Sequence, residues 1–452
     1  MAGRPSELMY VETPLLEQLK QLGWAVVQLD DSEKHDPQKS FRESFSEVVI
    51  VSRLKAALKR LNPWLNDVQV DDLCVQVQNY PHPLRQILEN NEEVYDRITE
   101  GLSADNEESG EINCPVRLID WRDVDAYDGP NATDNDFLAI SQYKVRIPGK
   151  EEYIIPDIVL FVNGLPLVVI ECKAPDITEP MAEGIDQLMR YQNRRGAEEL
   201  EGVPELFYFN QIIMSTCFHD CRYSSITGGV SHFMEWKDAY PYKLRDINPN
   251  GKPSAQEIAV AGMLEPSHLL DIVQNFIAYK DEDNGIRVKL VPRYMQYRGA
   301  SKIIERLRTA DKGEKGGTLW HTQGTGKTLT MMFVIRKMYN SFDLNNYKVV
   351  LIVDRKDLQT QMFKTTKTVK YAINIAGSID GLKDLIKNTA SDVTVAMVHK
   401  FGEAEKSKDK KGKKTGSLEQ RTSVSTFPVL NTSDRILVMI DEAHRSEYSE
   451  LA

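Results

Sequence analysis

The sequence predicts an α/β fold in two parts, a mixed sheet flanked by helices followed by a lobe built on a parallel sheet. The first part is predicted by two apolar strands joined by Asn163-Gly164, which is a strong hairpin signal. From about residue 262 the pattern becomes helix–strand–helix with uniformly apolar strands, which suit a buried parallel sheet. These strands are expected at Val349–Val353, Val393–Val398 and Ile436–Ile440.

The composition is that of an ordinary globular protein, with 41% hydrophobic and 27% charged residues. Five cysteines in 452 residues do not make a disulfide framework, which predicts a cytoplasmic protein. The start of the chain lacks the apolar core of a signal peptide, and no apolar run approaches the roughly 20 residues of a membrane helix. We therefore expect no membrane partner. The net charge of −11 argues mildly against coating DNA through bulk positive charge, but basic residues can still line one channel.

In the first part, Glu12–Leu29 is expected to form a helix that runs into a strand, because its leucines have helical spacing and end at Gly23. Further helices are expected at Phe45–Leu61 and Leu84–Gly101. Strands are expected at Val116–Ile119, Phe137–Val145, Ile154–Val162, Leu167–Cys172 and Gln211–Ser215. Residues 240–256 hold three prolines and the turn pair Asn250-Gly251. We therefore expect one domain at 1–245, a linker at 246–261 and a second domain at 262–452.

The hairpin carries a set of residues typical of a metal-dependent nuclease. It brings Asp157 near Glu171 and Lys173, and the latter two lie two residues apart, on one face of a strand. Carboxylates are hard oxygen ligands suited to Mg²⁺, which polarises a scissile phosphate and lowers the pKa of its bound water. Lys173 is then expected to orient that water or to stabilise charge in the transition state. This is the PD-(D/E)xK pattern, weak alone and stronger at the exit of an apolar hairpin.

Two further features belong to the predicted nuclease site. Gln187 and Tyr191 lie one helical turn apart on one face, as in the Gln-x-x-x-Tyr element beside the site of RecB-like nucleases, where it supports DNA binding. The alternative is a helix with an ordinary polar face. Glu12, in the first helix, is a candidate additional metal ligand. Cys217, His219 and Cys221 lack the spacing of paired zinc ligands and are expected to be structural.

The second part contains a candidate phosphate loop. Gly324-Thr325-Gly326-Lys327-Thr328 follows a short expected strand, Thr318–Trp320, and opens an expected helix, Leu329–Tyr339. The glycines let backbone N–H groups of the loop, which begins near Thr322, approach the phosphates of ATP at a helix N-terminus. Lys327 would neutralise the β- and γ-phosphates, and the Thr328 hydroxyl would bind Mg²⁺. The full pattern has glycine where this chain has His321.

Residues on either side of the loop support an ATP-driven motor. Asp441 and Glu442 follow a strongly apolar strand, at the end where ligands bind in such sheets. Asp441 would hold Mg²⁺, and Glu442 would orient or deprotonate the attacking water. Arg293 and Gln296 lie about 30 residues before the loop, where superfamily 2 helicases carry a glutamine that reads adenine. Arg355 resembles a DNA-contacting position of that superfamily. The expected lobe is RecA-like.

The order and wording of these motifs resemble the N-terminal part of the restriction (motor, R) subunit of type I restriction–modification enzymes. The resemblance rests on Pro156-Asp157, Glu171-Cys172-Lys173, Gln187–Tyr191, Trp320–Thr328, Val353–Leu358 and Asp441–Ser446. It implies an ATP-dependent double-stranded DNA translocase joined to a Mg²⁺ endonuclease, a type I site-specific deoxyribonuclease that cuts unmodified DNA away from its recognition site. It also implies methyltransferase and specificity subunits as partners, with S-adenosylmethionine bound there and not on this chain.

The chain stops at Ala452, before any second RecA-like lobe, and is interpreted as a fragment. We expect it to bind ATP weakly without efficient hydrolysis or translocation. Two other interpretations are open at this stage. One is a stand-alone helicase–nuclease in DNA repair or phage defence. The other is a non-catalytic DNA-binding scaffold that keeps its sites by descent.

Overall fold

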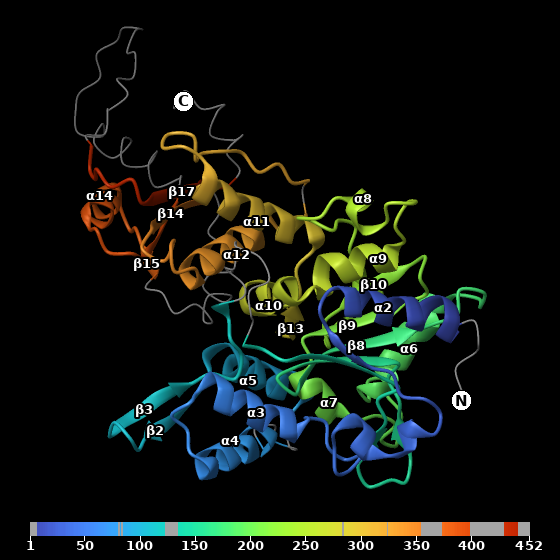
Figure 1. The fold of residues 1–452 in the computed structure, drawn as a ribbon. Helices are drawn as coiled ribbons and strands as arrows, with labels where there is room; N and C mark the ends of the chain where they lie inside the picture. The colour runs from blue at the N-terminus through green and yellow to red at the C-terminus, as the bar shows by residue number, and fades with distance from the viewer. Residues whose placement is uncertain are drawn as a thin grey trace, which may run out of the picture. The chain divides into compact units, whose positions relative to one another are not determined.

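The computed structural model describes residues 7–79, 82, 85–122, 134–282, 284–322, 324–353, 373–397 and 429–441 (Figure 1). The chain divides into two compact units, Met1–Met295 and Gln296–Ala452. Across the residues described, no helix is both long enough and apolar enough to span a membrane.

The first unit is built on a seven-stranded mixed sheet, as the sequence predicts. The strand order is β1-β4-β7-β8-β9-β10-β11, and the β1–β4 and β8–β9 pairs are parallel whereas the others are antiparallel. The central strands are buried along their whole length, which is why they are almost continuously apolar. The strands are β1 (Ala25–Val27), β4 (Phe137–Ser141), β7 (Ile158–Val162), β8 (Leu165–Cys172), β9 (Ile212–Thr216), β10 (Cys221–Ser224) and β11 (Met234–Glu235).

The predicted hairpin is β7–β8. Asn163 and Gly164 at its turn have φ angles of 53° and 82°, the left-handed conformation that a two-residue turn of this kind requires. Gly164 also packs closely, since an added Cβ would lie 2.5 Å from the carbonyl oxygen of Ile50. Ile158 pairs with Ile170 in the antiparallel register, so Asp157 comes opposite Glu171 at the far end of the hairpin. The expected proximity of these two residues is therefore confirmed.

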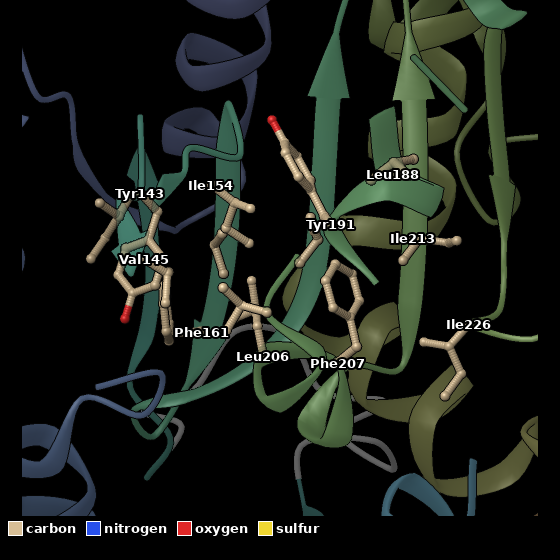
Figure 2. Packing of buried hydrophobic residues seen from close by; sticks show 14 of the residues in the cluster. Tyr143, Val145, Ile154, Phe161, Leu188, Tyr191, Leu206, Phe207, Ile213 and Ile226 are labelled. Carbon is tan, nitrogen blue, oxygen red and sulfur yellow. The ribbon is translucent and has the colours of Figure 1, made fainter. Parts of the chain in front are cut away.

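Helices cover the sheet of the first unit. Helix α6 (Pro180–Tyr191) packs on β8 and β9, and α7 (Pro204–Phe209) packs on β8. Figure 2 shows side chains from both helices packed with residues of the sheet, in a core that includes Phe161, Leu188, Phe207 and Ile213. The other helical elements of this unit are η1 (Leu8–Glu12), α2 (Thr13–Gln21), η2 (Glu33–His35), η3 (Pro37–Ser40), α3 (Val51–Leu61), α4 (Asp67–Asn79), α5 (Ile87–Glu100), η5 (Val230–His232), α8 (Leu244–Ile247), α9 (Ala255–Ala259), η6 (Val260–Leu264) and α10 (Pro266–Asn275).

The units divide at a different place from the expected linker. Residues 246–261 include α9, which begins with a Ser254 capping box, and Gln256 and Ala259 are buried. Gln256 donates to the carbonyl oxygen of Val11 and accepts from Thr216, so this segment is tied to the first unit. Of the three prolines, Pro253 directly precedes the Ser254 cap of this packed helix. The described residues of the first unit also form two-stranded ribbons, which pair β2 (Leu102–Asn106) with β3 (Glu111–Val116), β5 (Val145–Arg146) with β6 (Tyr153–Ile154), and β12 (Ala278–Asp281) with β13 (Arg287–Leu290).

The second unit has a four-stranded sheet in the order β15-β16-β14-β17, and every pair is parallel. The three apolar strands predicted for this part are all present in it. Residues 318–320 form no strand, and Trp320 is exposed, so the predicted strand before the phosphate loop is wrong. An apolar run of three residues is too short for its sequence pattern to decide its structure. The elements are α11 (Tyr294–Thr309), which begins just before the division, α12 (Lys327–Asn340), β14 (Lys348–Val353), β15 (Ile373–Ile375), α14 (Ile379–Lys387), β16 (Val393–Met397) and β17 (Ile436–Ile440).

The hairpin turn provides a stability test. Gly164→Ala is expected to lower the free energy of unfolding by roughly 2–3 kcal/mol, because the new Cβ meets a backbone oxygen in a left-handed conformation. The matched control is Gly196→Ala, since Gly196 also has a positive φ of 76° but a Cβ there meets nothing within 4 Å. We expect a loss of about 1 kcal/mol at the control. Urea denaturation measures both, and equal losses would contradict the close packing of the turn.

Candidate functional site

Asp157 and Glu171 face each other at the open end of the β7–β8 hairpin. Asp157 precedes β7, and Glu171 is the penultimate residue of β8. Both carboxylates are buried, and the Asp157 Oδ2 atom accepts a 2.7 Å hydrogen bond from the backbone N–H of Cys172. The neighbouring strand thus fixes the orientation of the Asp157 carboxylate.

Lys173 forms an ion pair with Glu171. Its Nζ donates to Glu171 Oε1 at 2.6 Å and to the carbonyl oxygen of Cys172 at 3.0 Å. Its backbone N–H donates to the carbonyl oxygen of Thr216, which extends the parallel pairing of β8 with β9. Helix α6 passes close to this point, since a Cβ on Gly184 would lie 2.1 Å from the Ser215 hydroxyl oxygen and 3.4 Å from Cγ of Lys173. The lysine is therefore held by a strand on one side and a helix on another.

Two more acidic residues, from the N-terminal helical segment, form a cluster with Asp157, Glu171 and Lys173. Glu12, named above as a candidate ligand, is buried, and Glu7, which the sequence analysis missed, accepts a 3.2 Å hydrogen bond from the N–H of Ala174. The segment Leu8–Glu12 is a π-helix, whose hydrogen bonds span five residues. Because a π-helical turn is wider than an α-helical turn, Glu7 and Glu12, which are five residues apart, point toward the same face. In an α-helix they would point in different directions. The sequence gives no signal of the wider turn.

Gln142 is a second residue that the sequence analysis missed. It directly follows β4, and its side-chain amide donates to Glu12 Oε2 at 3.1 Å and to Asp157 Oδ1 at 3.2 Å. Its backbone N–H donates to the carbonyl oxygen of Asp157 at 2.7 Å. Its φ of 51° is left-handed, which is uncommon for a residue other than glycine. The sequence pattern predicted that this position lies within a strand, and nothing in it indicated that Gln142 contacts the site.

Burial and mutual repulsion dominate the electrostatics of the cluster. Burial, followed by repulsion from Asp157, raises the pKa of Glu12 to about 8 and the pKa of Glu171 well above its ordinary value. Burial likewise raises the pKa of Asp157, although Lys173 opposes this. Burial favours a lower pKa for Lys173, but the Glu171 and Asp157 carboxylates outweigh it and raise that pKa. The lysine is thus a fixed positive charge beside an excess of acidic groups.

The residues present fit a hard divalent cation. Among the described residues, Glu12 Oε1 and Glu171 Oε2 are buried oxygens without a hydrogen-bond partner, and such atoms are costly unless a cation or donor satisfies them. Oxygen ligands from carboxylates are those that Mg²⁺ prefers. In the described part of the chain, no three acidic, histidine or cysteine side chains already have the geometry of a metal site. A cation would therefore have to draw these carboxylates closer together.

Gln187 and Tyr191 lie on α6 as predicted and touch each other. Gln187 donates to the Tyr191 hydroxyl at 2.6 Å, and this hydroxyl donates to the carbonyl oxygen of Ile155 at 3.0 Å. The Tyr191 ring is buried in the core with Leu188 (Figure 2). In this arrangement Tyr191 supports the backbone two residues before Asp157.

The candidate phosphate loop has the conformation that its glycines permit. Gly324 and Gly326 have φ angles of 80° and 79°, and α12 begins at Lys327. The loop is closed by a bond from the Thr325 hydroxyl to the carbonyl oxygen of Thr322. The amide of Gln296, expected to contact adenine, donates to the carbonyl oxygens of Thr325 and Gly326 at 3.0 and 3.3 Å. Gln296 is thus coupled to the loop directly.

The structure describes some of the other predicted motor residues and not others. Asp441 follows β17, as predicted, and its N–H donates to the carbonyl oxygen of Ile352 on β14. Thr328 lies in the first turn of α12. Arg293 is exposed and belongs to the first unit, whereas Gln296 begins the second. Glu442 and Arg355 lie outside the described residues.

Comparisons with known proteins decide the family. Residues 4–229, half of the chain, match the family described as "Type I restriction enzyme R protein N terminus". The chain belongs to this R-protein family. Residues 295–452 match a second family, described as "SWI2/SNF2 ATPase". The nuclease-like motifs and the phosphate loop thus fall in two different family matches.

Curated relatives agree with this assignment along the whole chain. The sequence is 28% identical to the type I restriction enzyme HindI endonuclease subunit of Haemophilus influenzae, over 97% of this chain and 39% of that protein. It is 26% identical to the putative type I restriction enzyme MjaIXP endonuclease subunit of Methanocaldococcus jannaschii, over 100% of this chain and 41% of that protein. The chain therefore spans about two fifths of the length of these relatives.

The raised pKa of Glu12 predicts how stability depends on pH. Because this pKa is about 8 in the folded chain and near 4.5 without burial, the folded chain holds a proton that the unfolded chain has released between these pH values. The contribution of Glu12 to stability is therefore fully present below pH 4.5 and is lost as the pH rises to 8. Over this range the free energy of unfolding falls by up to about 1.4 kcal/mol per pH unit.

Thermal unfolding in EDTA between pH 5.5 and 8.5 tests this. The wild-type chain should lose more stability across the range than Glu12→Gln, which cannot ionise, and Mg²⁺ should restore part of the loss at high pH. Identical pH profiles for the two proteins would show that Glu12 titrates normally.

Proposed function

We propose that the first unit is a PD-(D/E)xK-type endonuclease domain that uses Mg²⁺ to cleave DNA. The observation that carries the proposal is the convergence of Asp157, Glu171 and Lys173 at the exit of the β7–β8 hairpin. The buried oxygens of Glu12 and Glu171 that lack partners among the described residues support a cation at this point. A structural role alone gives no reason to bury so many carboxylates together.

The side chains then have distinct roles. Asp157 and Glu171 would hold the cation, with Glu12 as a further ligand. When bound, Mg²⁺ would polarise the scissile phosphate and lower the pKa of its bound water. Lys173, protonated because the carboxylates raise its pKa, would donate hydrogen bonds to the water or to phosphate oxygens. Tyr191 supports the backbone before Asp157, and Gln187 on the same face would contact the DNA.

We further propose that the second unit is a RecA-like lobe of an ATP-driven DNA translocase. The glycine-rich loop at the N-terminus of α12 supports this, as does the position of Asp441 at the end of a buried parallel strand. Backbone N–H groups of the loop, Lys327 and Thr328 would hold the phosphates and Mg²⁺ of ATP, with Asp441 as a further Mg²⁺ contact. Gln296 would report adenine binding to the loop through its bonds to the carbonyl oxygens of Thr325 and Gly326.

The complete protein is proposed to act as the restriction subunit of a type I restriction enzyme. It would translocate double-stranded DNA with ATP and cut unmodified DNA away from the recognition site. Methyltransferase and specificity subunits would be its partners and would bind S-adenosylmethionine. The names of the relatives and the two family matches support this proposal.

The two proposed centres can be separated by mutation. In the complete protein that contains this sequence, combined with methyltransferase and specificity subunits, Asp157→Ala should lower cleavage of unmethylated circular DNA at least about a hundredfold, because several kcal/mol of metal stabilisation are lost. ATP hydrolysis should be unchanged. Lys327→Ala should abolish both activities, since it loses a phosphate contact and cleavage needs translocation.

Cleavage gels and phosphate release on the same samples provide the measurement. Cutting that persists in Asp157→Ala would show that the nuclease centre lies elsewhere. Cutting that needs neither ATP nor the partner subunits would favour a stand-alone nuclease over a type I enzyme.

A further inference from the structure

Gln142 occupies a position that its sequence context does not explain. Ser141, the last residue of β4, pairs with Ile158 of β7, so Gln142 comes opposite Asp157 at the point where the strands end. There the backbone leaves the extended conformation for a left-handed one, with φ of 51°. This conformation is unfavourable for a residue with a side chain, and such outliers persist where the surrounding structure enforces them.

The result of that bend is a bridge between two acidic residues from distant parts of the chain. The amide nitrogen of Gln142 lies 3.1 Å from Glu12 Oε2 and 3.2 Å from Asp157 Oδ1, and it has two hydrogens to donate. The backbone N–H of the same residue holds the Asp157 carbonyl oxygen. Gln142 therefore fixes both the main chain of Asp157 and the orientation of its carboxylate.

We propose that Gln142 is a positioning residue of the nuclease centre, whose amide orients the Asp157 and Glu12 carboxylates to bind the divalent cation. This inference rests on the proposed nuclease function. Gln142 acts through the two carboxylates and does not itself contact the reacting phosphate.

The chemistry of the amide suits this task. It donates to the carboxylates without adding positive charge, so the excess negative charge that attracts a cation is kept, whereas a lysine there would neutralise it. Asp157 Oδ1 is held by Gln142 and Oδ2 by the N–H of Cys172, and each oxygen keeps a further lone pair. Glu12 has one oxygen on Gln142, and its other oxygen has no partner among the described residues. Groups that orient the ligands of a metal in this way typically change its affinity about 10- to 100-fold.

Two substitutions distinguish the role of the Gln142 amide from that of the left-handed backbone conformation. Gln142→Gly deletes the side chain and accepts the left-handed conformation freely, so folding should be kept. Gln142→Asn keeps an amide and tolerates the same conformation, but it is one methylene too short to bridge both carboxylates. Gln18→Ala is the matched control, because Gln18 also donates from a partly buried amide, to the carbonyl oxygen of Glu257, away from the cluster.

The measurement is Mn²⁺ binding by isothermal titration calorimetry to the 452-residue chain without nucleotide, with thermal unfolding of each variant as the check on folding. Both Gln142 variants should bind Mn²⁺ about 10- to 100-fold more weakly than the wild type. Gln18→Ala should bind like the wild type, and Asp157→Ala should lose the site.

The outcomes distinguish this inference from the function on which it rests. If Asp157→Ala loses the site while folded Gln142 variants bind as tightly as the wild type, the positioning role is overturned and the nuclease centre stands. If the wild-type chain shows no Asp157-dependent binding at all, the proposed nuclease centre itself is contradicted. If Gln142→Gly does not fold, the affinity of Gln142→Asn decides.

Discussion

The antiparallel pairing of β7 with β8 is the constraint on which the candidate nuclease centre depends. The left-handed turn at Asn163-Gly164 pairs Val162 with Leu165, and a one-residue register shift between Phe161 and Leu160 then brings Asp157 opposite Glu171. A slip of one residue would turn one carboxylate to the other face of the sheet, since side chains alternate along a strand. Lys173 directly follows β8 of the same hairpin, whereas Gln142, which follows β4, and Glu12, at the end of η1, come from other elements.

The charges of these side chains explain why the arrangement favours a bound cation. Four acidic side chains and one lysine meet in a largely buried region, and burial raises the pKa of each acidic group. Hydrogen bonds from Gln142 and Cys172 satisfy part of the cluster. A dication would compensate the remaining negative charge and bind the oxygens of Glu12 and Glu171 that lack partners among the described residues. The stability of the unit and its proposed chemistry are therefore linked through the same carboxylates.

Much of this architecture can be predicted from the sequence because its signals are local. The Asn163-Gly164 turn and the uniformly apolar strands of both sheets depend on neighbouring residues, and the structure confirms them. The Asn163-Gly164 hairpin predicts that Asp157 lies near Glu171, whereas the one-residue register shift between Leu160 and Phe161 that puts them directly opposite each other is seen only in the structure. The Gln187–Tyr191 contact follows from helical spacing.

The features that were missed depend on tertiary structure. Glu7 reaches the cluster through a π-helical turn, and Gln142 through a left-handed bend, and neither conformation has a sequence signature here. The prolines near residue 250 were interpreted as a linker, but α9 is tied to the first unit through Gln256, and the units divide after Met295. For Glu442 and Arg355, outside the described residues, the sequence predictions stand untested.

The central claim is that the β7–β8 hairpin creates a divalent-cation site, and anomalous diffraction from crystals of this chain grown with Mn²⁺ and without nucleotide tests it most directly. The account predicts an anomalous peak in contact with carboxylate oxygens of both Asp157 and Glu171, with Glu12 turned toward it. Ordered carboxylates without such a peak, with Lys173 still bonded to Glu171 at saturating Mn²⁺, would contradict the claim.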